Sequence, residues 1–281
     1  MTKQLAFGLV AEGDSRYSEI LRLPNLSEDL GPVKSSSFGS ARRLCNFLRA
    51  GYAISEYDEL QAARVILLRV ADEVLPRVVE ELVSAGLVLS NLSFVLCESW
   101  MTTDALAPLR DAGAAVATIM NVPTERRNWF VMEGQPMAIF HLRRFIERND
   151  ARAVELRPGT KSLYFAAELL VHALPVPLLI AAQQAFRATG ITSKNLASIS
   201  GEMIQEMARG LLKGARTTWG GPLAQSSPET AAAHLETLRS RNPDIAGIID
   251  HYLPYAQEMM ANYRRPNDEA NAAAADAAGQ T

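Results

Sequence analysis

The sequence predicts an α/β domain built on a parallel sheet, followed by an all-helical domain. Over residues 1–157, continuous apolar runs such as 64–70 alternate with helix-like stretches, a pattern typical of a parallel sheet covered on both faces. After Gly159 the strand patterns stop and the remaining apolar stretches have helical spacing. We therefore expect a sheet domain at 1–157, a helical domain at 158–263 and an unstructured tail at 264–281.

The strands of the first domain are expected where short apolar runs end at turn residues. The first covers residues 5–10, and Asp14 or Ser15 should cap a helix that Pro24 interrupts. A second short strand and its loop follow at 31–37, and a helix at 40–50 should end at Gly51. Further strands are expected at 64–70, 92–97 and 114–120, helices at 74–85 and 103–112, and edge strands at 128–133 and 153–156 around a helix at 136–148.

The second domain is predicted to consist of helices at 161–189, 193–213, 227–239 and 243–262. Pro175 and Pro177 should kink the first of these, because each removes a backbone donor. Residues 162–182 are the only membrane candidate, but they include Glu168, His172 and both prolines and have no flanking aromatic belt. A buried core helix of a protein outside the membrane is therefore expected.

Composition narrows the function classes. Hydrophobic residues make up 48% of the chain and charged residues 21%, as in ordinary globular proteins. The net charge of −3 argues against a nucleic-acid binder. Cys45 and Cys97 form no pairing pattern, which favours a reducing, cytoplasmic location, and the four histidines are too scattered to predict a metal site.

The turn after the first strand is where a dinucleotide fingerprint would lie. Of its three glycines only Gly13 is present, and Glu12 and Asp14 add negative charge that Arg16 could offset. The predicted cofactor contacts here are Ala11, Gly13 and Arg16. The alternative is a scaffold that binds dinucleotide weakly or not at all, because the motif is weak alone.

The loop after the second strand has no acidic residue to bind a ribose 2′-hydroxyl. Lys34 and the hydroxyls of Ser35, Ser36 and Ser37 could instead hold a 2′-phosphate, which favours NADP over NAD. A solvated polar loop is the alternative interpretation.

Lys161 enters a long apolar helix, where burying an ammonium requires a partner, a lowered pKa or a cleft. It is our candidate catalytic acid/base, with Tyr164 one helical turn away. A salt-bridged surface lysine is the alternative. Glu98, Ser99 and Asn121 follow strands on the edge where open α/β sheets bind ligands, and are predicted to line a substrate pocket, although polar residues are common in such loops.

Several short motifs, taken in order, resemble one family. They are Ser40-Ala41-Arg42-Arg43-Leu44, Tyr57-Asp58-Glu59-Leu60-Gln61-Ala62-Ala63, Leu106-Ala107-Pro108-Leu109, Lys161-Ser162-Leu163-Tyr164 and Gly220-Gly221-Pro222-Leu223-Ala224. With this spacing the chain resembles Rossmann-like proteins carrying the DUF2520 domain, within the 6-phosphogluconate dehydrogenase-like superfamily.

The resemblance implies an N-terminal dinucleotide-binding domain and a helical C-terminal domain that pairs two subunits. It also implies hydride transfer between a nicotinamide and a small substrate, with a lysine matched here by Lys161. Relatives place histidines where Glu98 and Asn121 stand, and Ser36 replaces an arginine. Three hypotheses remain open: an NADP-dependent oxidoreductase, a non-catalytic scaffold or small-ligand binder, and partner binding through the helical domain.

Overall fold

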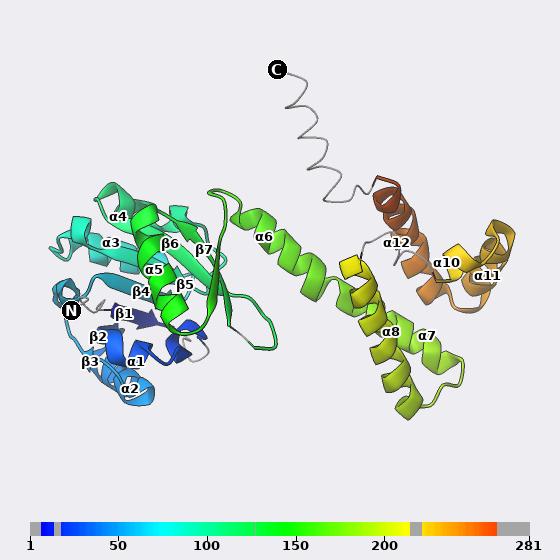
Figure 1. Ribbon diagram of the computed structural model, residues 1–281, viewed down its shortest axis with the longest axis horizontal. Coiled ribbons are helices and arrows are strands. Elements are labelled where there is room, and N and C mark those ends of the chain that lie inside the picture. Colours follow the sequence, from blue (N-terminus) through cyan, green and yellow to red (C-terminus); the bar gives the residue numbers. More distant parts are fainter. Residues whose placement is uncertain (1–6, 14–17, 127, 214–220, 263–281) are drawn as a thin grey trace, which may run out of the picture. The chain divides into compact units, whose positions relative to one another are not determined.

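The computed structural model describes residues 7–13, 18–126, 128–213 and 221–262 (Figure 1). Two compact units make up the chain, Met1–Ala167 and Glu168–Thr281. The contacts thus divide the chain after Ala167, within the first long helix, so the start of that helix belongs to the sheet unit. The division after residue 157 stays a prediction.

The first unit contains one eight-stranded sheet in the order β3-β2-β1-β4-β5-β6-β7-β8. All neighbouring strands pair in parallel except β6 and β7, which confirms the predicted sheet class. The strands are β1 (Phe7–Glu12), β2 (Leu30–Ser35), β3 (Tyr52–Ala53), β4 (Val65–Val70), β5 (Ser93–Cys97), β6 (Ala115–Asn121), β7 (Trp129–Gly134) and β8 (Arg152–Glu155).

Two details of the sheet differ from the sequence prediction. The prediction of an edge strand at 128–133 was wrong, because β7 lies between β6 and β8 and only β8 of this pair is at the edge. The connection from β6 to β7 is too short for a crossover, so the two strands pair antiparallel. The two-residue strand β3 was missed because Tyr52 and Ala53 are too few to give a period.

Helices cover both faces of the sheet, and a separate apolar core lies under each face (Figure 1). Phe7 of β1 packs against Phe145 of α5 in one core, with ring centroids 4.6 Å apart. The longer helices are α2 (Phe38–Leu48), α3 (Leu75–Ser84), α4 (Ala107–Asp111) and α5 (Pro136–Arg148). Short turns of 3-10 helix are η1 (Ile20–Arg22), η2 (Asp58–Ala62), η3 (Leu89–Asn91) and η4 (Thr103–Leu106).

The segment after β1 does not form the long helix expected from the sequence within its described part. There it contains only η1 and the four-residue helix α1 (Leu26–Asp29). Asp14 and Ser15, the predicted caps, lie outside the described residues. Asp29 of α1 is tied to Arg148 at the end of α5, so this segment is held by the far end of the sheet domain.

Helix α2 begins at a serine cap and ends earlier than predicted. The Ser37 hydroxyl accepts a hydrogen bond from the Ser40 amide, satisfying one of the free donors of the first turn. The helix ends at Leu48 because Arg49 adopts a left-handed conformation, φ 52°, two residues before the expected stop at Gly51.

Cys97 is the last residue of β5 and is fully buried. Its thiol donates to the Val95 carbonyl, and burial raises its pKa. Cys45, on α2, is partly exposed, and both thiols are free.

The long apolar helix after the sheet begins with α6 (Lys161–Glu168), continues through the π-helical turn η5 (Leu169–Ala173) and ends with α7 (Pro175–Ala188). The Leu174 amide bonds to the Leu169 carbonyl, five residues back. Pro175 and Pro177 have no amide to continue the regular ladder, so the irregularity falls where the prolines predicted a kink. The remaining helices are α8 (Ser193–Lys213), α10 (Pro222–Gln225), α11 (Pro228–Arg241) and α12 (Pro243–Asn262).

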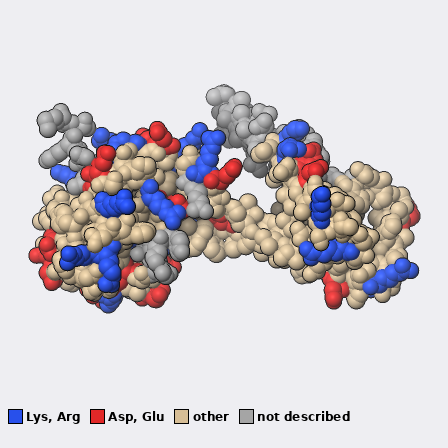
Figure 2. All heavy atoms as spheres, turned by 90° about the horizontal axis from the view of Figure 1, so that it is seen from below, with Lys and Arg blue, Asp and Glu red and all other residues tan. Residues whose placement is uncertain are grey.

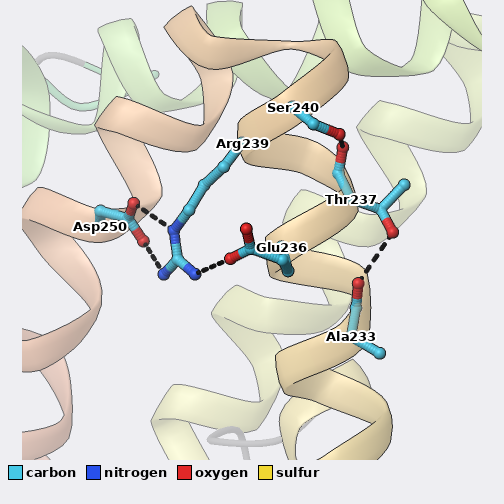
Figure 3. Close-up of polar contacts among 6 residues, drawn as sticks. All are labelled: Ala233, Glu236, Thr237, Arg239, Ser240 and Asp250. Atoms are coloured by element: carbon cyan, nitrogen blue, oxygen red, sulfur yellow. Dashed lines mark hydrogen bonds and ion pairs between the residues drawn. The ribbon is translucent and has the colours of Figure 1, made fainter.

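In the second unit, Arg239 on α11 ties that helix to α12. Its guanidinium donates two hydrogen bonds to the Asp250 carboxylate, at 2.7 and 2.8 Å, and a third to Glu236 (Figure 3). These charge-assisted bonds further raise the arginine pKa and lower that of Asp250. The two-point contact fixes how α11 and α12 pair.

The helix that spans residues Lys161–Ala188 is far less buried than the sequence predicted. Only 6% of its most apolar window is buried. The same window has a mean hydropathy of 1.9, so by length and composition the helix could cross a membrane. The prediction of a buried core helix was therefore wrong for the single chain. Apolar residues are also exposed on α8, and tan surface, which marks residues other than Lys, Arg, Asp and Glu, predominates over the helical unit in Figure 2.

Candidate functional site

The candidate site lies at the carboxyl edge of the sheet, where the turns after β1, β4 and β5 meet. Gly13 follows β1 with a φ of 83°, a left-handed conformation that glycine adopts without strain. A Cβ at Gly13 would lie 2.8 Å from the Cβ of Ala71, the residue after β4. The chain after β1 therefore approaches the chain after β4 so closely that no side chain fits at Gly13.

Lys161 is the charged residue most completely enclosed at this edge, at 2% exposure. Its Nζ donates hydrogen bonds to the carbonyls of Ser99, at 2.8 Å, and Met101. Burial lowers the pKa of the amine to about 8, against the opposing charges of Glu133 and Asp72. The amine therefore loses its proton at a lower pH than an ordinary lysine does.

The turn after β5 is held by hydrogen bonds from its own and neighbouring turns. The Ser99 hydroxyl donates to Asp72 at 2.7 Å and accepts from the Met101 amide at 3.1 Å. Together with Lys161, these bonds connect the ends of β4 and β5 to the start of α6. Ser99 thus contributes structure to the predicted pocket through its hydroxyl and its carbonyl.

Glu98 occupies a different place from the one its sequence position suggested. Its Oε1 accepts from the Glu19 amide at 2.6 Å and from the Ile20 amide at 3.4 Å, and its Oε2 lies 3.4 Å from Arg69 Nε. Glu98 has a φ of 55°, which is uncommon for a residue other than glycine. The carboxylate therefore anchors the segment after β1 to the turn after β5.

The negative charge of Glu12, beside Gly13, is balanced by an arginine that was not predicted from the sequence. Arg77 on α3 bonds to Glu12 and Glu81, each at 2.7 Å. Arg16, the predicted counter-charge, lies outside the described residues. Helical spacing places Arg77 and Glu81 together, but nothing in the sequence indicates that Glu12 joins them across the fold.

Lys34 faces a crevice rather than the serine hydroxyls beside it. Its Nζ lies 4.9 Å from the centre of the Tyr57 ring and donates to the Ser35 carbonyl at 3.1 Å. Tyr57 in turn bonds to Glu81, and burial raises the pKa of the Tyr57 hydroxyl. The crevice measures about 540 Å³ and is lined by Lys34, Glu56, Tyr57, Asp58, Glu81, Ser84 and Ala85.

The serine loop after β2 is divided between structural and exposed groups. The Ser35 hydroxyl donates to the Ala11 carbonyl at 2.7 Å, which ties the loop to β1, and Ser37 caps α2. Ser36 is exposed. Arg43 donates to the Ser40 hydroxyl at 3.0 Å and so lies beside the start of α2. It belongs to a motif that supported the family resemblance, but no role for it was predicted from the sequence.

Asn121 and Tyr164, the remaining pocket candidates, come from different elements. The Asn121 amide donates to the Trp129 carbonyl at 3.2 Å and closes the connection between β6 and β7. The Tyr164 ring stacks on Trp100, with centroids 6.0 Å apart. The structure thus brings Lys161, Ser99 and Tyr164 together and uses Glu98 and Asn121 as ties. Of the predicted cofactor contacts near β1, Gly13 lies on the neighbouring turn, whereas Ala11 is buried inside β1.

Among the described residues, no group of three histidine, cysteine or acidic side chains is arranged to hold a metal ion.

The DUF2520 family model, described as a domain of unknown function, matches residues 128–252. This part of the chain is therefore similar to DUF2520 domains. The match begins before β7 and runs into α12, so the DUF2520 region includes the last two strands of the sheet as well as most of the helices. The family resemblance inferred from the sequence is confirmed.

Solved structures share the fold of this protein at low sequence identity. A protein from Thermotoga maritima has a TM-score of 0.66 at 15% identity, with 92% of this chain and all of that chain covered (100%). An imine reductase from Streptomyces aurantiacus has a TM-score of 0.64 at 15% identity, with 90% of this chain and 95% of that chain covered. An imine reductase from Myxococcus stipitatus, in complex with NADP+, has a TM-score of 0.63 at 12% identity, with 92% of this chain and 94% of that chain covered. No curated protein matches the sequence.

The protein therefore has a Rossmann-like fold with a helical C-terminal region, which it shares with these structures.

Proposed function

We propose that the protein is an NADP-dependent reductase that transfers hydride to a small substrate with a C=N or C=O bond. The observation that carries this proposal is Lys161: an amine at 2% exposure, with a pKa lowered to about 8, at the carboxyl edge of a sheet of this fold. Structures of this fold that include imine reductases support the choice of reaction.

The residues present fit a dinucleotide with a 2′-phosphate. Gly13, in its left-handed conformation, forms the turn where a pyrophosphate would lie, and Arg77 neutralises the adjacent Glu12. Ser36, Ser37 and Arg43 gather at the start of α2, where a phosphate would be favoured. Lys34 faces the neighbouring crevice and would contact the adenosine half. When bound, the reduced nicotinamide supplies the hydride.

Lys161 is suited to deliver the accompanying proton. An ammonium has three donors, and two of them bond to the carbonyls of Ser99 and Met101. The third is left for a substrate nitrogen or oxygen, which gains a proton as its carbon gains hydride. A pKa near 8 keeps the group protonated at neutral pH yet able to release its proton.

A non-catalytic, ligand-binding scaffold is the second candidate, and Glu98 favours it. Its carboxylate accepts hydrogen bonds from the amides at the start of η1, groups that an anion would otherwise bind. Together with the single glycine of the turn, this contact would weaken dinucleotide binding.

Fluorescence titration with NADPH and NADH separates the two candidates. We expect NADPH to bind in the micromolar range and NADH at least about tenfold more weakly. The reason is that only NADPH carries a ribose 2′-phosphate for Arg43 to bind. Arg43→Ala should remove most of that difference, while the control Arg144→Ala, on α5, should keep it. Binding of both nucleotides only in the millimolar range would discard the reductase and leave the scaffold.

We also propose that two copies of the chain associate through the helical region in the cytoplasm. The exposed apolar residues of η5, α7 and α8 support this, as does a groove of about 230 Å³ between α7 and α8, lined by Phe186, Met203 and Met207 among others. Helical pairing of subunits is what the family resemblance implies. A second copy suits this surface better than lipid, because the segment carries the Glu168–His172 pair.

A further inference from the structure

Trp100 is a large aromatic side chain left 42% exposed in the middle of the turn after β5. The residues on either side of it are fixed, because Lys161 donates to the carbonyls of both Ser99 and Met101. Glu98, one residue further back, is held by the amides of η1. The turn is therefore rigid while its indole faces solvent.

Two further rings extend Trp100 into an aromatic wall, which we define as Trp100, Tyr164 and Phe165. The Tyr164 ring lies nearly parallel to the indole, at 27° and 6.0 Å, and the Phe165 ring stands edge-on to it, at 77° and 5.0 Å. Both come from the first turns of α6, which Lys161 begins. Since Lys161 bonds to the turn and starts the helix, one side chain holds both parts of the wall in place.

The aromatic wall lies beside the groups proposed to carry out the chemistry. Trp100 is between the two residues whose carbonyls bind the Lys161 amine, and Tyr164 is one helical turn from Lys161. A substrate atom that takes a proton from Lys161 would thus have the rest of its molecule next to these rings. Burial of flat apolar area against a fixed indole favours a planar, unsaturated group.

We propose that the aromatic wall binds an aromatic ring of the substrate, and that the protein acts on compounds in which such a ring adjoins the reducible bond. This inference rests on the proposed reductase function. A ring stacked on a rigid indole loses little conformational freedom and gains an oriented contact that a saturated ring of the same size cannot make.

Binding of two matched cyclic imines tests the proposal without any turnover. The probes are 2-phenyl-1-pyrroline and 2-cyclohexyl-1-pyrroline, which differ only in the unsaturation of the side ring, titrated calorimetrically into the full chain without nucleotide. We expect the phenyl compound to bind about tenfold more tightly, an amount within the range of aromatic stacking. Trp100→Ala should abolish the preference and Trp100→Phe should retain most of it.

The control is Trp129→Phe, on β7, which removes another indole and should leave the preference unchanged. Equal binding of both imines by the unchanged protein, or of neither, would overturn the proposal. So would a Trp100→Ala protein that keeps the preference but halves its mass in light scattering, because the wall would then be a contact between subunits. A phenyl preference in a protein that binds no NADPH would reject the reductase and leave the aromatic wall standing.

Discussion

The amine of Lys161 shows how one residue combines a structural with a chemical property. Its hydrogen bonds to two carbonyls are strongest when it is protonated, whereas its burial favours the neutral form. The opposing effects, with Glu133 and Asp72 nearby, leave a pKa of about 8. Proton transfer at this position therefore requires little free energy near neutral pH.

The stability of the protein should consequently rise with pH between about 8 and the ordinary lysine pKa of 10.5. The folded pKa is the lower of the two, so burying the charge is costly below pH 8, and the cost falls as the folded protein loses the proton first. Comparing urea denaturation at pH 7 and 9.5, we expect the native protein to gain about 1–2 kcal/mol relative to Lys161→Met.

The exposed Lys194 provides the control for that comparison, since Lys194→Met should show no such pH-dependent difference from the native protein. A Lys161→Met protein whose stability runs parallel to the native one between pH 7 and 9.5 would show that the amine has an ordinary pKa.

Some site residues could be predicted from the sequence because their chemistry is local. A lysine at the start of an apolar stretch indicates a buried amine, and Lys161 is buried. A glycine directly after a strand indicates a left-handed backbone, and Gly13 adopts one. Arg77 and Glu98 could not be assigned, because their partners Glu12, Glu19 and Ile20 are distant in sequence and meet only through the sheet order. Whether these residues bind a cofactor stays a prediction.

At the scale of elements, β6 and β7 form the one antiparallel pair of the sheet, and Gly134 ends it. A Cβ at Gly134 would lie 2.5 Å from the Cα and Cβ of Ala117 and from the carbonyl oxygen of Val116. Short apolar runs identified both strands, but their order in the sheet depends on this close approach of backbones, which no local pattern encodes.

Gly134→Ala should therefore destabilise the sheet unit by several kcal/mol, on the order of 2–4, because backbone atoms must move to admit the methyl group. The matched control is Gly39→Ala on α2, where a Cβ meets nothing nearer than 4.0 Å. This second substitution should be neutral or stabilise by about 0.5–1 kcal/mol. Urea denaturation measures both, and equal stabilities would contradict the packing argument.

The irregular helix from α6 to α7 was predictable in part. The two prolines located its break, and helical spacing located its length, because both are local properties. Its exposure was not predictable, since the same apolar sequence suits a core helix, a membrane span or an interface between chains.

For the whole molecule, the exposed helix surface leads us to expect a dimer. Light scattering after size exclusion should give about twice the chain mass of 30.7 kDa. Val171→Asp, at a position 68% exposed in the single chain, should shift the protein to monomer by placing a charge in the interface.

The control Gln184→Asp, at an exposed polar position of α7, should leave the dimer intact. A monomeric native protein would refute the proposed pairing. Recovery of the native protein only with detergent would instead favour insertion of the 161–188 helix into a bilayer.

The enclosure of Cys97 at the end of β5 has a practical consequence. Because that sulfur is shielded and stays protonated, thiol-directed reagents encounter Cys45 first. A single dye or spin label can thus be directed to the partly exposed Cys45, near the end of α2, without first removing the other sulfur by mutagenesis.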